Sequence, residues 1–193
     1  MKKLIGLTGK TGAGKSTVSR YLSEKGAYVI DGDIIAREAL AEDNSLLRRL
    51  SDAFGSDILE NGALNRRLLA KRAFADAQAT ALLNSIMHPA INLLIKKRCE
   101  KAFEKFDVVV VDAAAIIESG FADECDQLWV DYAPVEIRKE RFMKRDSISE
   151  EDALIRINGQ KNDEFYFSKA TRIIKCFEPF DFKVQIDEIK DLF

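Results

Sequence analysis

Near its N-terminus the chain reads Gly9-Lys10-Thr11-Gly12-Ala13-Gly14-Lys15-Ser16, which fits the pattern G-x-x-x-x-G-K-[ST]. An apolar run, residues 4–7, precedes this stretch, and a helix-like segment, residues 16–22, follows it. A strand, a glycine-rich turn and a helix in this order form the setting of a phosphate-binding loop, or P-loop. The sequence therefore predicts that residues 9–17 bind the phosphates of ATP. The alternative is a glycine-rich turn that binds nothing.

Each residue type in this loop has a chemical reason. Gly12 and Gly14 allow a tight turn that brings successive N–H groups close to phosphate oxygens. The helix expected to begin near Lys15 adds the positive end of its dipole. Lys15 reaches the outer phosphates, and the hydroxyl of Ser16 is a ligand for Mg²⁺. We therefore assign ATP binding to the following residues of the loop: Gly12, Ala13, Gly14, Lys15, Ser16 and Thr17.

Composition limits the class of protein. The chain has 193 residues, of which 47% are hydrophobic and 32% charged, so we expect one globular domain with a small inserted part. The net charge of −2 gives no basic signature of nucleic-acid binding. The apolar runs are too short for a secretion signal or a membrane span, and three cysteines without C-x-x-C spacing favour a reducing cytosol. We expect a cytoplasmic monomer or weak homo-oligomer that binds neither nucleic acid nor membrane.

Short apolar strands alternate with helical segments along the chain. Strands are expected at residues 3–8, 27–31, 106–112, 128–131 and 172–175. Helices are expected at residues 15–25, 33–41, 44–54, 134–145, from 149 onward, and 182–191. This α/β pattern predicts a parallel sheet flanked by helices, with ligands beyond the carboxyl ends of the strands.

Two segments stand apart from this alternation. Apolar residues recur at mostly helical spacing between residues 65 and 105, with Pro89 expected at the first turn of a helix, and this predicts a helical insertion over about 61–105. The core then covers about 1–60 and 106–193. A basic hairpin over about 138–160 reads as a lid whose arginines stabilise charge in the transition state, Arg145 by binding ATP. Its arginines are Arg138, Arg141, Arg145 and Arg156. The alternative is a solvated helix face paired with Glu136, Glu140, Glu150 and Glu151.

Acidic residues follow two of the expected strands. One carboxylate of Asp31-Gly32-Asp33 is placed to accept a proton from a substrate hydroxyl, whereas the alternative for Asp33 is the N-cap of a helix. Asp112 ends a valine-rich strand in the manner of a Walker B carboxylate that holds Mg²⁺; the alternative is an ordinary polar residue at a strand end. His88, the single histidine, is a candidate ligand-binding residue or simply part of a turn into a helix.

Taken together, the separated motifs resemble those of the dephospho-CoA kinase family. In chain order the pieces are Gly6-Leu7-Thr8-Gly9 with Gly12–Thr17, Val29-Ile30-Asp31-Gly32-Asp33, Asn61-Gly62-Ala63-Leu64-Asn65-Arg66, Asn84 with His88-Pro89, and Arg141–Asp146 with Arg156–Gln160. They span most of residues 4–160, and the D-x-D, G-x-L-x-R and Asn…His-Pro pieces are more specific than the P-loop. The resemblance implies a P-loop kinase fold with a core, a helical acceptor-binding subdomain and a lid.

The resemblance also implies a reaction and roles for named residues. The γ-phosphoryl group of ATP would move to the ribose 3′-hydroxyl of dephospho-CoA, the last step of coenzyme A synthesis. By position in the motifs, Asp33 matches the general base, and Lys15 and Arg141 match cations that stabilise the phosphates. The residues assigned to acceptor binding are Asp33, Arg66, His88 and Glu118. The metal ligands implied for Mg²⁺ are Ser16 and Asp112.

Two other functions stay open from the sequence. One is a P-loop kinase for another nucleoside or nucleotide-like molecule. The other is a module that binds ATP without transferring phosphate. Retention of both Lys15 and Asp33 argues against the module, because a sensor of ATP needs no base to activate an acceptor. The chain also departs from the family pattern at Lys10, where the family usually has glycine.

Overall fold

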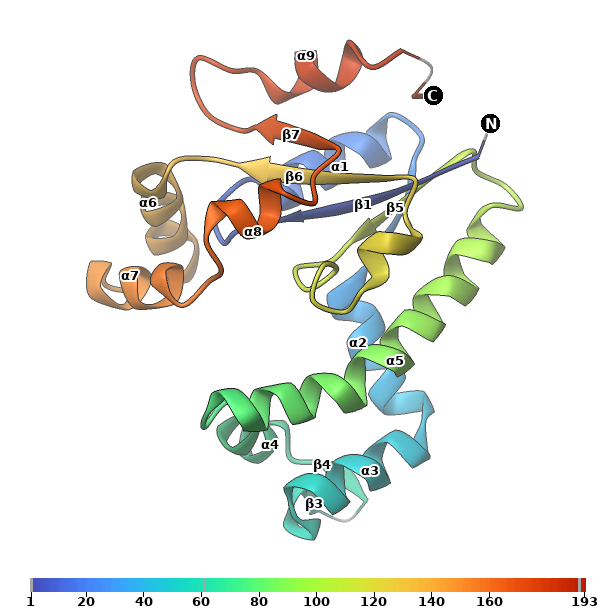
Figure 1. Cartoon of the computed structure of the whole chain (residues 1–193), viewed down its shortest axis with the longest axis vertical. Helices are drawn as coiled ribbons and strands as arrows, with labels where there is room; N and C mark the ends of the chain where they lie inside the picture. The colour runs from blue at the N-terminus through green and yellow to red at the C-terminus, as the bar shows by residue number, and fades with distance from the viewer. Residues whose placement is uncertain (1, 61, 191) are drawn as a thin grey trace. The chain divides into compact units, whose positions relative to one another are not determined.

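The computed structural model describes residues 2–60, 62–190 and 192–193. The chain forms two compact units (Figure 1). The first contains the residues up to Asp31 together with Cys99–Phe193, and the second contains Gly32–Arg98. Each unit has its own packed apolar residues, and we describe each by itself.

A five-stranded parallel sheet forms the centre of the first unit (Figure 1). Its strands are β1 (Lys3–Gly9), β2 (Tyr28–Asp31), β5 (Val108–Asp112), β6 (Gln127–Tyr132) and β7 (Arg172–Lys175), in the order β2-β5-β1-β6-β7. In register, Asp31 lies beside Asp112 and Gly9 lies beside Asp131. The P-loop and three carboxylates therefore leave the sheet at the same edge, which confirms the predicted fold class.

The helices of the first unit pack through apolar residues, some of them against this sheet. The helices of the first unit are α1 (Lys15–Glu24), α6 (Val135–Asp146), α7 (Glu150–Asn158), α8 (Asp163–Phe167) and α9 (Phe182–Asp187), with a short 3₁₀ helix η2 (Phe121–Glu124). Val18 and Leu22 of α1 and Ile186 of α9 share one core cluster with strand residues such as Ile5 and Trp129. The sequence did not predict α8, and the helix expected to run to 191 ends at Asp187; residue 191 itself lies outside the described residues.

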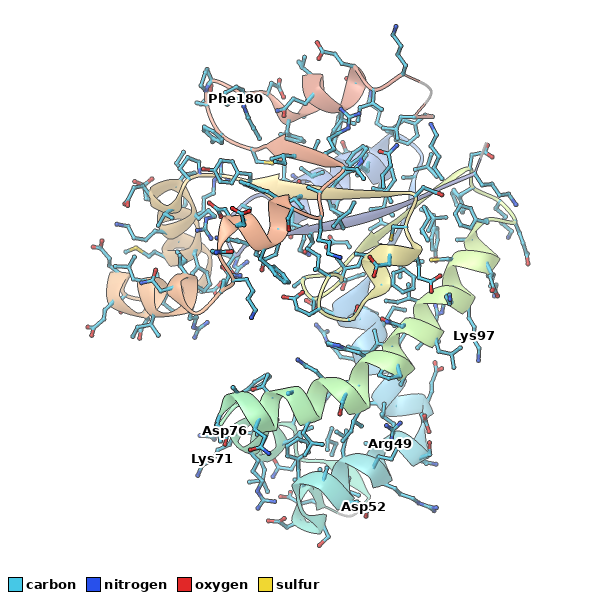
Figure 2. The ribbon with its side chains drawn as sticks, in the orientation of Figure 1. Arg49, Asp52, Lys71, Asp76, Lys97 and Phe180 are labelled. Carbon is cyan, nitrogen blue, oxygen red and sulfur yellow. The ribbon has the colours of Figure 1, made fainter. Side chains whose placement is uncertain are left out.

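The second unit is mainly helical. Its elements are α2 (Gly32–Glu42), α3 (Asn44–Phe54), η1 (Ser56–Ile58), the antiparallel pair β3 (Leu59–Glu60) and β4 (Ala63–Leu64), α4 (Arg66–Ala73) and α5 (Ala77–Ala102), the last of which runs on into the first unit. Leu46, Leu50 and Phe54 recur every four residues and bury one face of α3, whereas Arg49 and Asp52 extend from its other side (Figure 2). The unit begins at Gly32, whereas the sequence predicted that the insertion starts at about residue 61. Residue 61 itself lies outside the described residues. The earlier start arises because α2 and α3 share the core cluster of α4 and α5.

Pro89 does not start a helix. It lies inside α5, which runs without interruption from Ala77 to Ala102, so the expectation of a new helix at this position is wrong. Proline removes the hydrogen bond to the carbonyl of Ser85 and crowds the preceding turn, so it bends a helix; Figure 1 shows α5 bending along its length. Apolar residues on both sides of Pro89, among them Met87 and Leu94, pack in one cluster, which keeps the two halves continuous. Within the described ranges, no helix combines the length and apolar character that crossing a membrane requires.

Candidate active site

The P-loop joins the end of β1 at Gly9 to the start of α1 at Lys15. Gly12 and Gly14 have φ angles of 79° and 127°, which L side chains rarely adopt. At Gly12 space is also restricted, because a Cβ atom there would lie 2.5 Å from the carbonyl oxygen of Arg138. Both glycines are therefore required by the backbone path of the loop.

The N-terminal end of α1 faces the ligand edge of the sheet without a side-chain cap. Gly14 occupies the N-cap position, and no side chain accepts a hydrogen bond there. The first N–H groups of a helix have no carbonyl partner within it, so this end attracts anions. Ser16 and Thr17 lie on the first turn and are exposed. The predicted phosphate-binding residues therefore have the geometry that a phosphate site requires.

Lys15 and Asp112 form an ion pair between the P-loop and the end of β5. Only 24% of the Lys15 side chain and 10% of the Asp112 side chain are exposed. The structure therefore brings together the predicted phosphate cation and the predicted Walker B carboxylate. Oxygen donors from a carboxylate and from the nearby hydroxyl of Ser16 suit Mg²⁺, which needs only one or two protein carboxylates when phosphates supply further ligands. Across the described residues no group of three or more His, Cys, Asp or Glu side chains is placed to hold a metal by itself.

Asp131 is a residue of this site to which the sequence assigned no role. It lies in β6 beside Gly9, is 2% exposed, and neither of its carboxylate oxygens has a hydrogen-bond partner in the described part of the chain. Burial raises the pKa of Asp131 well above its usual value, and the charge of Asp112 raises it further, whereas Lys15 lowers it. Two carboxyl groups therefore share one lysine at the base of the P-loop. The sequence signal was its position at the end of a strand, which does not reveal burial.

Arg141 of α6 reaches the P-loop directly. Its Nη1 donates to the carbonyl oxygens of Gly12 and Ala13, both at 3.3 Å, and its Nη2 donates to the carbonyl oxygen of Cys176 at 2.7 Å. The guanidinium thus ties α6, the P-loop and the end of β7 together. Arg138, one turn earlier, is buried with 3% exposure, and this burial lowers its pKa. The start of the predicted lid, residues 138–141, is therefore packed against the P-loop.

Arg145 and Arg156 lie at the other end of the α6–α7 hairpin. They flank the ring of Phe142 at 5.1 and 5.7 Å and both pair with Asp146, at 2.6 and 3.9 Å. The hydrogen bond from Arg145 lowers the pKa of Asp146. More than 60% of each arginine side chain is exposed, so both are accessible to a ligand. In the same hairpin Lys139, rather than an arginine, pairs with Glu136 and Glu150.

The residues predicted to bind the acceptor lie in both units. Asp33 is the second residue of α2, inside its first turn and exposed. Arg66 is the first residue of α4 and exposed, behind Asn65, whose side chain caps that helix. His88 lies within α5 and is half-buried. These three residues belong to the second unit, whereas Glu118 is exposed on the turn that follows β5 in the first.

Comparison with known proteins identifies relatives of the whole chain. A family model described as dephospho-CoA kinase matches residues 3–177. A dephospho-CoA kinase from Corynebacterium diphtheriae is 42% identical over 175 residues, which cover 89% of this chain and 87% of that protein. Another from Moorella thermoacetica is 38% identical over 174 residues, covering 89% and 82%.

Solved structures agree with this comparison. A crystal structure of a Thermus thermophilus protein superposes with a TM-score of 0.80 and 27% identity, covering 97% of this chain and 98% of that one. A dephospho-CoA kinase from Campylobacter jejuni superposes with a TM-score of 0.70 and 26% identity, covering 97% and 96%. The fold of the chain is therefore similar to that of a solved dephospho-CoA kinase.

Proposed function

The chain belongs to the dephospho-CoA kinase family, and we propose that it transfers the γ-phosphoryl group of ATP to the ribose 3′-hydroxyl of dephospho-CoA, giving coenzyme A and ADP. The observation that carries the proposal is that the family match over residues 3–177 includes both the P-loop and Asp33. A phosphate site and a carboxylate for the acceptor are the two parts that transfer needs. We place the reaction in the cytoplasm, in keeping with free thiols at Cys99, Cys125 and Cys176.

ATP would bind with its phosphates at the uncapped N-terminal end of α1. Lys15 then exchanges its partner, leaving Asp112 for the outer phosphate oxygens, since both are anionic and compete for one ammonium group. Arg141 binds the carbonyl oxygens of Gly12 and Ala13, so the N–H groups of the loop would be the atoms that face the phosphates. When bound, Mg²⁺ would neutralise charge on the phosphate oxygens, with Asp112 and Ser16 as its protein ligands.

Asp33 would orient the acceptor hydroxyl and take its proton as the phosphoryl group arrives. It follows the end of β2 by two residues, and β2 lies beside β5 at the ligand edge of the sheet. Arg66, His88 and Glu118 would bind the acceptor, and the exposed Arg145 would bind ATP from the lid. These roles come from matching positions in the family motifs.

An assay of ADP release across several acceptors tests the function. The purified chain is given Mg·ATP with dephospho-CoA, adenosine, AMP or no acceptor. Of these acceptors, we expect only dephospho-CoA to give ADP release, together with a product of the mass of coenzyme A. Preference for adenosine or AMP would identify a kinase of another nucleoside or nucleotide. Nucleotide binding without ADP release for any acceptor would identify a binding module.

A matched pair of variants tests the general base. Asp33→Asn keeps the shape of the side chain but accepts no proton, so we expect kcat to fall about 10²–10⁴-fold while both substrates still bind. Asp31→Asn is the control, because Asp31 is the last residue of β2 whereas Asp33 lies in the first turn of α2, so the two side chains leave different elements, and we expect a much smaller loss. A larger loss for Asp31→Asn would reverse the two assignments. Mild losses for both would mean that neither carboxylate acts as a base.

A further inference from the structure

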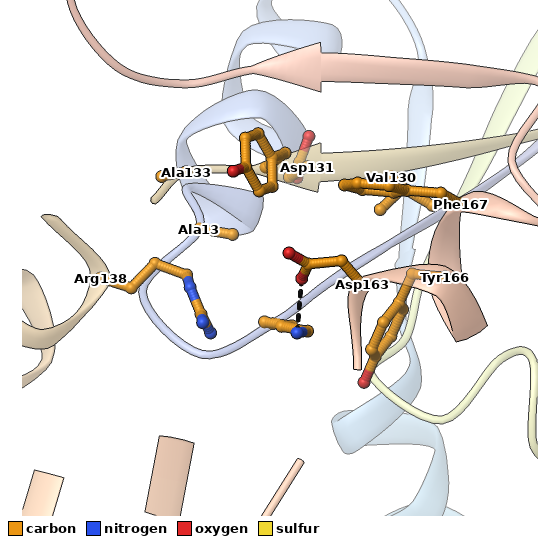
Figure 3. Close-up of a pocket in the computed structure, with 10 residues that line it drawn as sticks. Ala13, Val130, Asp131, Ala133, Arg138, Asp163, Tyr166 and Phe167 are labelled. Carbon is orange, nitrogen blue, oxygen red and sulfur yellow. Dashed lines mark ion pairs between the residues drawn. The ribbon is translucent and has the colours of Figure 1, made fainter. Parts of the chain in front are cut away.

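Lys10 is a P-loop residue whose charged group pairs with a carboxylate of α8. Its Nζ lies 2.5 Å from Oδ1 of Asp163, the first residue of α8, and 5.8 Å from the centre of the Tyr166 ring. Only 14% of the Lys10 side chain is exposed, against 45% for Asp163. Both residues line a small cavity together with Ala13, Asp131 and Arg138, and Figure 3 marks the ion pair that Asp163 makes there. The amine of Lys10 is therefore committed to α8.

The next residue of the loop is tied to the same part of the chain. The N–H group of Thr11 donates to Oε1 of Gln160 at 3.1 Å, and Nη1 of Arg138 approaches the same oxygen at 3.5 Å. Two consecutive P-loop residues thus contact the segment 160–166, about 150 positions further along the chain. These contacts restrain an irregular loop that has two glycines at positive φ.

The anchor is itself well fixed. Asn162 caps α8, with its Oδ1 accepting from the N–H of Phe165 at 3.0 Å. Tyr166 is 5% exposed, and burial raises the pKa of its hydroxyl. Phe167 packs edge-on against Tyr132 at the end of β6, with ring centres 5.4 Å apart. These contacts therefore attach α8 to the sheet.

We propose that Lys10 is a positioning residue of the kinase. Through Asp163 it holds the first part of the P-loop, residues 10–11, against α8, so that the N–H groups that bind phosphate are aligned before ATP arrives. This inference rests on the proposed function, because it concerns the ATP that the reaction consumes. A preordered loop loses little conformational freedom on binding, which strengthens affinity without a new contact to the ligand. Because Lys10 is paired with Asp163, Lys15, which is paired with Asp112, is the lysine of the loop that would change partner to bind the phosphates.

The experiment compares Lys10→Met, Asp163→Asn, the double variant and Lys10→Arg. We measure the Kd for ADP by calorimetry without acceptor, and KM and kcat with dephospho-CoA. Each single variant is expected to raise the Kd for ADP and the KM for ATP about 5-fold, the size typical of an ion pair with one buried partner. The double variant is expected to show no further loss, and Lys10→Arg to recover most of the affinity. The kcat and the KM for dephospho-CoA are expected to stay within 2-fold, as positioning of the nucleotide alone predicts.

Lys25→Met is the matched control. Lys25 and Asp187 form a 2.9 Å ion pair at the opposite end of α1, so losing it leaves the P-loop unchanged and the Kd for ADP at the wild-type value. An unchanged Kd in Lys10→Met would overturn the proposal. So would a large loss in Lys10→Met with none in Asp163→Asn, because Lys10 would then touch the phosphates itself, and so would a fall in kcat alone.

The test remains decisive if a variant fails to fold or if the proposed function is wrong. If Lys10→Met fails to fold, Asp163→Asn carries the test alone, since its side chain is nearly half exposed. Binding of ADP does not require phosphoryl transfer, so the role of Lys10 is measured even if dephospho-CoA proves not to be the acceptor. A wild-type protein that binds ADP normally but fails to release ADP would defeat only the proposed function.

Discussion

Replacing Lys15 by methionine is expected to lower stability as well as activity. The sequence alone suggests an exposed lysine whose loss the fold would tolerate, but in the structure Lys15 pairs with Asp112 beside the buried Asp131. Removing one partner of a fully buried pair costs about 3–5 kcal/mol, and losing an exposed pair costs about 0.2–1 kcal/mol. With exposures of 24% and 10%, this pair lies between these limits. We expect Lys15→Met to lower the free energy of unfolding by about 2 kcal/mol.

Thermal and urea denaturation measure this loss. In a chain of this size, 2 kcal/mol corresponds to a fall in Tm of about 4–8 °C. Lys25→Met, which breaks the exposed pair with Asp187, is the control and is expected to cost much less than Lys15→Met. The double variant Lys15→Met, Asp112→Asn is expected to regain at least half of the loss, because position 112 then carries no unpaired charge. A Lys15→Met protein as stable as wild type, or a double variant less stable than the single one, would refute this reasoning.

Two further variants test the base of the P-loop. Gly12→Ala is expected to abolish ATP binding, because its Cβ would meet the Arg138 carbonyl at 2.5 Å; Gly26→Ala, also at positive φ but with open space around it, is expected to keep ATP affinity in calorimetry. Asp131→Asn is expected to gain stability over wild type as pH rises above about 4. A carboxyl group whose pKa is higher in the folded protein than in the unfolded chain makes the wild type less stable as pH rises above the unfolded value. The free energy of unfolding of both proteins from urea denaturation at pH 5 and pH 8 measures this difference.

The P-loop, the parallel sheet and the carboxyl-end carboxylates were predictable because each depends on neighbours in sequence. Apolar runs followed by glycine or aspartate indicate strands and their ends locally, and parallel strands bring those ends, such as Gly9 and Asp131, to one edge of the sheet. The roles of Asp33, Arg66 and His88 in the acceptor site stay predictions.

Other features could not be predicted because they depend on distant packing. Pro89 is tolerated within α5 because residues on both sides of it pack in the same cluster. The strands β3 and β4 span two residues each, which is too short for an alternation of apolar and polar residues to be recognised. The burial of Asp131 and the commitment of Lys10 to Asp163 arise from contacts across the fold, which residue type and spacing do not reveal.

The contacts around the P-loop also limit which part of the predicted lid moves. Arg141 donates to two carbonyls of the loop, and Arg138 packs on Gly12, so the first half of α6 is bound to the phosphate site. In the described part of the chain, the ion pairs and ring contacts of Arg145 and Arg156 are instead with Asp146 and Phe142 of their own hairpin.

A lid closing over ATP would therefore move residues 145–156 while the root at 138–141 stays fixed. Hydrogen exchange tests this division. We expect ATP with dephospho-CoA to slow exchange of amides in 145–156 and to leave those in 138–141, already protected in the free enzyme, nearly unchanged. Equal changes over both segments would mean that α6 moves as a whole, which the hydrogen bonds of Arg141 to the loop oppose.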